Sequence, residues 1–76
     1  MTATDTGDDR VLFDVDHDQR IATMTLNNPE RRNTYDPAMR DAMARCLDQV
    51  AEDDDLTVVL LRGAGGTFST GADMNN

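Results

Sequence analysis

The chain has 76 residues, the size of one small domain, and a formal net charge of −8. A domain of this size buries only about 60% of the surface that its unfolded chain exposes, so we expect marginal stability. The negative charge argues against nucleic acid and anionic membranes as partners, because both bind accumulated positive charge. One cysteine, Cys46, and the absence of a long apolar run or signal peptide predict a cytoplasmic protein without an internal disulfide.

The first part of the chain combines aspartates with small residues and has little to bury. We therefore predict a disordered acidic tail over residues 1–10, followed by one folded region over residues 11–76. Apolar and polar residues then alternate over 11–16 and again over 21–26, which is the period of half-buried strands. The intervening turn contains His17, which we expect to be exposed, so the two strands should form an antiparallel hairpin.

Three aspartates at alternate positions, Asp14, Asp16 and Asp18, are typical of the start of a calcium loop. Such a loop needs glycine at its sixth position and glutamate at its twelfth, where this chain has Gln19 and Thr25. We predict no metal site there.

A helix is predicted to begin at Asp36 and Pro37, which supply an N-cap acceptor and a preset φ angle. Its apolar positions recur at helical spacing and should face a core: Met39, Ala42, Met43, Cys46, Leu47, Val50 and Ala51. The acidic run over residues 52–55 is unfavourable at a helix C-terminus, so the helix should end there.

The apolar run Leu56–Leu61 predicts a parallel strand buried on both faces. A glycine-rich segment follows, and glycine lets the backbone approach a ligand closely. Gly71-Ala72-Asp73 is typical of a helix start, whose free N–H groups can hold negative charge.

Three familiar glycine loops do not fit this segment. A phosphate loop beginning at Gly66 would need Lys-Ser/Thr where the chain has Ala72-Asp73. A dinucleotide loop beginning at Gly63 would need its third glycine at Phe68, and a hydrolase elbow around Ser69 would need glycine at residue 67. What remains is donation by neutral backbone N–H groups, which suits an oxyanion that forms during a reaction.

The segment from Gly63 to Asp73 (GAGGTFSTGAD), preceded by Thr25 to Asn33 (TLNNPERRN) and a helix, resembles the opening of the crotonase (enoyl-CoA hydratase/isomerase) superfamily. The resemblance covers about residues 11 to 76, with both motifs in the expected order and spacing. It implies an α/β fold: one ββα turn of a crotonase-like superhelix plus the first strand of the next turn, truncated.

The resemblance also implies a site for acyl-CoA thioesters, in which two backbone N–H groups stabilise the thioester enolate. The first donor would be the N–H of Ala72, with Asp73, Met74 and Asn75 lining the CoA side. Asn75 stands where family members often have lysine, so phosphate contacts would fall to Arg31 or Arg32.

Asp73 is more consistent with a capping residue than with a catalytic base. A further departure is Thr34, which replaces the usual alanine. The solvated-loop alternative for the two arginines stays open.

Hydration of 2-enoyl-CoA in fatty acid metabolism is the commonest reaction of the superfamily, and the resemblance implies no cofactor beyond the coenzyme A of the substrate. The second N–H donor and the acid and base residues lie, in the family, beyond the matched segment. A competing hypothesis is therefore a non-catalytic remnant or assembly module. The partner would then be another copy of the chain, as a homo-oligomer, or a chain that completes the domain.

Overall fold

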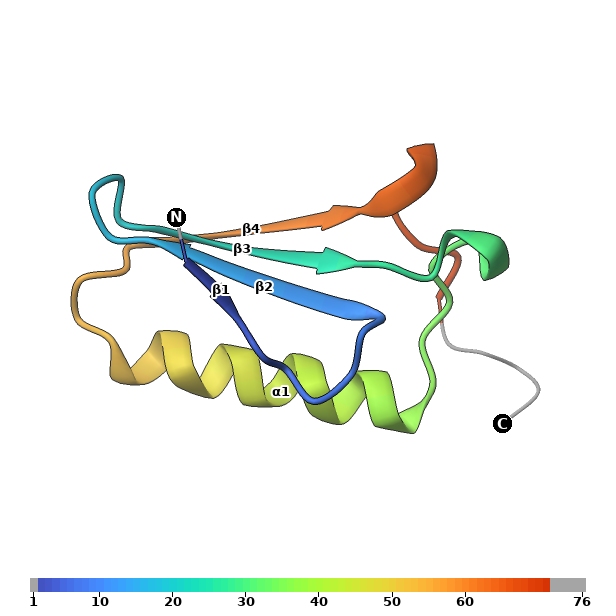
Figure 1. Ribbon diagram of the computed structural model, residues 1–76, viewed down its shortest axis with the longest axis horizontal. Helices are drawn as coiled ribbons and strands as arrows, with labels where there is room; N and C mark the ends of the chain where they lie inside the picture. The colour runs from blue at the N-terminus through green and yellow to red at the C-terminus, as the bar shows by residue number, and fades with distance from the viewer. Residues whose placement is uncertain (1, 72–76) are drawn as a thin grey trace.

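The computed structural model describes residues 2–71, with side chains from residue 4 onward, as a sheet covered on one face by a helix (Figure 1). The elements in chain order are β1 (Thr2–Thr4), β2 (Val11–Asp16), β3 (Ile21–Leu26), the 3-10 helix η1 (Pro29–Arg31), α1 (Pro37–Glu52), β4 (Val58–Gly63) and the 3-10 helix η2 (Ala64–Gly66). The strands lie in the order β1-β2-β3-β4, and only β3 and β4 run parallel. The predicted succession of hairpin, helix and parallel strand is confirmed.

The core forms between the hairpin and α1. Strands β2 and β3 pair in a register that sets Phe13 opposite Met24, and both side chains are buried. Helix α1 lays Met39, Ala42 and Cys46 onto them, each at most 1% exposed. The alternation read from the sequence therefore marks the core-facing residues, although Thr25 on the opposite face of β3 is buried as well. Leu47 was expected in the core, but it lies at the margin of the helix stripe and is 49% exposed.

Both ends of α1 lie where the sequence predicts them. The Asp36 side chain accepts a hydrogen bond from the Met39 amide, and Pro37 occupies the first turn. The helix ends at Glu52, and Asp53 caps it through an N–H bond to the Val50 carbonyl. Among the described residues, no helix is both long and apolar enough to cross a membrane.

Strand β4 differs from the prediction in bounds and in burial. It covers Val58–Gly63 rather than Leu56–Leu61, and Val58, Leu60 and Leu61 are each about half exposed. The physical reason is its place at the edge of the sheet, since among the described strands β4 pairs only with β3. Its apolar composition suits a strand with neighbours on both sides, which these residues do not supply.

The predicted disordered tail also differs from the structure. Strand β1 pairs antiparallel with β2, and the side chain of Thr6 is buried, with its hydroxyl donating to the Val11 carbonyl at 2.6 Å. The Arg45 guanidinium on α1 donates to the Thr6 carbonyl at 2.8 Å. Backbone pairing and one buried threonine hold this segment. Neither can be predicted from the polar composition of these residues.

Candidate functional site

The glycine-rich segment leaves the sheet beside the segment that follows β3. Because β3 and β4 are parallel, their carboxyl ends meet at one edge, where Leu26 is level with Gly63. The two 3-10 helices η1 and η2 follow these strands and contact each other. Figure 1 shows both segments together at the end of the sheet that is remote from the β2–β3 turn. The two motifs singled out in the sequence thus meet in space.

Two glycines allow the close approach of backbone at this edge. A Cβ atom at Gly63 would overlap the carbonyl oxygens of Thr67 and Phe68, so the chain folds back over a position that has no side chain. Gly65 has a φ of 75°, and a Cβ there would lie 2.7 Å from the Cβ of Pro29 in η1. The glycines are therefore required by the contact between the two segments.

Asn33 joins these segments through its side chain, which is fully buried. Its Oδ1 accepts the Asn28 amide at 2.8 Å, and its Nδ2 donates to the carbonyls of Ala64 at 2.8 Å and Thr67 at 2.5 Å. Its φ of 57° is in the left-handed region, which asparagine tolerates better than most residues. One carboxamide therefore satisfies polar groups on both segments.

The backbone continues this connection up to the end of the described chain. The Thr70 amide donates to the Arg32 carbonyl at 3.2 Å, and the Tyr35 amide donates to the Gly71 carbonyl at 3.1 Å. Between them, the Ser69 hydroxyl donates to the Asn33 carbonyl at 2.7 Å and accepts the Gly71 amide at 3.1 Å. Residues 69–71 are thus held against residues 32–35.

The predicted site residues divide between those that the structure describes and those that it does not. Arg31 ends η1, Arg32 follows it with a φ of 56°, and both are exposed beside the glycine-rich segment. Ala72, Asp73, Met74 and Asn75 lie outside the described residues. The structure therefore brings the arginines next to the segment that leads directly into Ala72.

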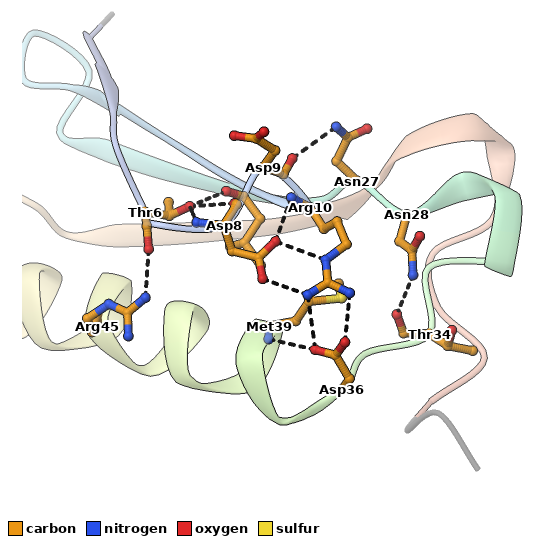
Figure 2. Close-up of polar contacts among 11 residues, drawn as sticks. Thr6, Asp8, Asp9, Arg10, Asn27, Asn28, Thr34, Asp36, Met39 and Arg45 are labelled. Carbon is orange, nitrogen blue, oxygen red and sulfur yellow. Dashed lines mark hydrogen bonds and ion pairs between the residues drawn. The ribbon is translucent and has the colours of Figure 1, made fainter. Parts of the chain in front are cut away.

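An ion-pair cluster links the start of β2 to the start of α1, and Figure 2 shows Arg10 between the two acidic side chains. The guanidinium lies 2.7 Å from a carboxylate oxygen of Asp8 and 2.7 Å from one of Asp36. Hydrogen bonds from Arg10 lower the pKa of Asp8. The pKa of Asp36 is lowered first by the Met39 amide and then by Arg10. This cluster secures the helix cap next to Tyr35.

One cavity among the described residues lies away from this edge, between the N-terminal segment and α1. It has a volume of about 330 Å³ and is lined by Asp5, Thr6, Gly7, Arg45, Cys46 and Gln49. Burial raises the pKa of the Cys46 thiol, which therefore stays protonated and unreactive. Within residues 2–71, no group of three histidine, cysteine or acidic side chains could hold a metal ion.

Sequence reasoning missed the roles of Asn33, Ser69 and Arg10. The sequence placed Asn33 only at the end of the first motif, with no indication that its side chain is buried. The Ser69 hydroxyl accepts the Gly71 amide two residues away, but the carbonyl to which it donates, that of Asn33, is 36 positions away in sequence and is not visible in the local pattern.

Comparison with known proteins identifies relatives of the chain. Residues 16–76 match the family described as Enoyl-CoA hydratase/isomerase. The chain is 45% identical over 56 residues to a 1,2-epoxyphenylacetyl-CoA isomerase of Escherichia coli, covering 74% of the chain and 21% of that protein. It is 31% identical over 64 residues to a trans-2-decenoyl-[acyl-carrier-protein] isomerase of Streptococcus mutans, covering 84% of the chain and 24% of the relative.

The fold is similar to that of solved structures. A crystal structure of enoyl-CoA hydratase from Mycobacterium tuberculosis superposes with a TM-score of 0.79 at 40% identity, over 88% of this chain and 29% of the other. The chain thus spans about a fifth to three-tenths of the length of these proteins. With its ββα turn and the strand that follows, the chain belongs to the enoyl-CoA hydratase/isomerase family, within the crotonase superfamily.

Proposed function

We propose that the chain forms part of a site for acyl-CoA thioesters and supplies one oxyanion donor, the backbone N–H of Ala72. The observation that carries the proposal is the pairing of residues 32–35 with residues 69–71, which holds the chain immediately before Ala72. It brings the family's two motifs to the same edge of the sheet. In this proposal Asp73, Met74 and Asn75 line the CoA side.

The chemistry requires a donor that is strong only when charge develops. As a thioester becomes an enolate, its carbonyl oxygen gains negative charge, and a fixed N–H stabilises that state more than the neutral ground state. One such donor typically contributes about 3 to 4 kcal/mol to transition-state stabilisation. We propose hydration of a 2-enoyl-CoA as the reaction of the complete site, with a second donor and the acid and base supplied from outside these residues.

In this proposal, the arginines of the first motif bind the nucleotide part of coenzyme A. Arg31 and Arg32 are exposed on the same edge as the glycine-rich segment, in a chain whose net charge is −8. Positive side chains at this position would attract the phosphates of coenzyme A. The proposed ligand is thus held by its phosphates at one segment and by its thioester at the other. Coenzyme A enters as part of the substrate, and we propose no separate cofactor.

The test is binding of acetoacetyl-CoA, whose enolate absorbs in the near ultraviolet, compared with binding of free CoA. We expect Ala72→Pro, which removes the N–H, to weaken acetoacetyl-CoA binding and to abolish the enolate absorbance. Ala72→Gly, which keeps the N–H, is the matched control and should retain both. If the unmodified chain binds neither ligand, or if the proline variant keeps the enolate signal, the proposal is wrong.

One observation favours a second function, that of a module which assembles with a partner. Strand β4 has an edge that pairs with none of the other described strands, and it exposes Val58, Leu60 and Leu61. An unpaired apolar edge is a template for pairing with another strand. Analytical ultracentrifugation distinguishes this function, because an assembly module would form complexes through β4 without binding acyl-CoA.

A further inference from the structure

We propose that Asn33 is the positioning residue of this site, and that its carboxamide sets the position of the glycine-rich segment (residues 63–71) relative to the arginine segment (residues 28–33). The claim that this positioning serves thioester binding rests on the proposed function. The claim that Asn33 joins the two segments rests on its hydrogen bonds alone. Asn33 itself touches no substrate in this account and acts through the backbone that it holds.

The Asn33 carboxamide is buried away from water. The Asn33 side chain is 0% exposed, and its amide nitrogen and oxygen have three backbone partners within hydrogen-bond distance. A buried polar group that loses its partners costs far more than a surface group, because water cannot replace them. The carboxamide therefore has one favourable arrangement, which defines the distance between the two segments.

The oxygen and the nitrogen of the carboxamide bind different segments. The oxygen accepts from the Asn28 amide, at the start of the arginine segment. The nitrogen donates to Ala64 and Thr67, on the glycine-rich segment. Each half of the amide thus faces a different segment, and a substitution can disturb one half while leaving the other intact.

Hydrogen bonds connect Asn33 to Gly71, the residue before the proposed donor. The Asn33 carbonyl accepts the Ser69 hydroxyl, and the same hydroxyl accepts the Gly71 amide, directly before Ala72. On the other side, the Tyr35 amide binds the Gly71 carbonyl. The Gly71 amide is therefore held through Ser69, which binds the Asn33 carbonyl, and the Gly71 carbonyl is held by the Tyr35 amide. Displacing a catalytic group by about 1 Å can lower the reaction rate about 100-fold.

Asn33→Asp is the sharpest test, because it keeps the shape and the oxygen acceptor but places a second oxygen against the carbonyls of Ala64 and Thr67. We expect amide hydrogen exchange at Thr70 and Tyr35 to quicken roughly tenfold or more. Exchange at Asn28 and at Cys46, in the middle of α1, should stay unchanged. Asn27→Asp is the matched control, since the Asn27 side chain donates only to the Asp9 carbonyl, at 3.3 Å and in an exposed position.

The functional measurement separates positioning from folding. Asn33→Asp should weaken acetoacetyl-CoA binding roughly tenfold and leave the affinity for free CoA unchanged, because Oδ1 of residue 33 still accepts the Asn28 amide within the arginine segment. Ser69→Ala, a milder change in the same chain of contacts, should show the same selective loss with a smaller amplitude. It keeps the test decisive if the aspartate variant does not fold.

Two results would overturn the inference. If exchange quickens equally throughout α1 and the sheet, Asn33 contributes only to global stability. If exchange at Thr70 and Tyr35 does not change in either variant, Asn33 does not hold the segment. Should the unmodified chain bind no acyl-CoA, the proposed function fails, while the exchange measurement still decides whether Asn33 sets the segment.

Discussion

The two ends of the β3–β4 pair are held in different ways, although each joins segments that are far apart in sequence. At the turn end, His17 lies 3.0 Å from Asp53 with a side chain that is 57% exposed, and Arg20 donates to the Asp55 carbonyl from an exposed position. At the loop end, Asn33 makes its three side-chain hydrogen bonds while fully buried. Figure 1 shows these ends on opposite sides of the molecule.

The two ends of the β3–β4 pair should therefore differ in rigidity. Exposed ion pairs contribute little, because water and salt screen them and both side chains lose freedom. Buried neutral hydrogen bonds are costly to break, because the separated groups stay away from water. The loop end should therefore be the more rigid end, and it is the end where both sequence motifs lie.

The largest effect that we expect comes from Gly63→Ala. The added Cβ would overlap the backbone oxygens of Thr67 and Phe68, which cannot move aside as a flexible side chain could. We expect the free energy of unfolding to fall by about 3 kcal/mol. Gly66→Ala is the control, because a Cβ there meets nothing within 4 Å and only the φ of 86° is unfavourable, at about 1 kcal/mol. Equal losses in urea titrations would contradict the close approach at Gly63.

A smaller effect should depend on pH and comes from Arg10→Gln. The pKa values of Asp8 and Asp36 lie below the unfolded value of 3.8, so their contribution is present above pH 3.8 and lost as pH falls through the folded values. The variant should be less stable than the unmodified chain near neutral pH, and the two should converge in acid. Urea unfolding at several pH values measures this difference.

His17→Gln is the control for Arg10→Gln at the other end of the molecule. The hydrogen bond with Asp53 raises the pKa of His17 above 6.5, so its contribution is present below pH 6.5 and lost as pH rises through the folded value. Because the pair is exposed, we expect a smaller loss than for Arg10, and none in alkaline solution. A larger loss for His17 would reverse the comparison between the two ends.

The smallest effect should be a gain, from Thr34→Val. Among the described residues, the Thr34 hydroxyl is buried without a hydrogen-bond partner. Replacing it with a methyl group of similar size should raise the free energy of unfolding by about 1 kcal/mol. Thr57→Val at the turn end removes an exposed hydroxyl that donates to the Arg20 carbonyl at 3.2 Å, and it should bring no gain. Thermal unfolding of both variants checks the difference.

The sequence was informative wherever the cause of a structure is local. The hairpin follows from alternation over residues 11–26, and α1 follows from the cap at Asp36 and the stripe that includes Met39. Family membership followed from two motifs in order. These features depend on neighbours within a few positions along the chain.

The features that the sequence did not reveal depend on distant partners. The Asn33 side chain binds Ala64 and Thr67, which are 31 and 34 positions away. The half-exposed side chains of β4 follow from its place at the sheet edge, and β1 follows from pairing with β2. The predicted site residues from Ala72 to Asn75 lie outside the described part of the chain, so their roles stay predictions.

The central claim is that residues 32–35 and 69–71 are joined by hydrogen bonds, and scalar couplings across those bonds test it most directly. We would measure the coupling between the Tyr35 amide nitrogen and the Gly71 carbonyl carbon, and between the Thr70 nitrogen and the Arg32 carbonyl carbon. We predict that both couplings are detectable together with those of the β2–β3 pair. Detection of the hairpin couplings alone would mean that the two motifs are not joined, and the account of the site would be wrong.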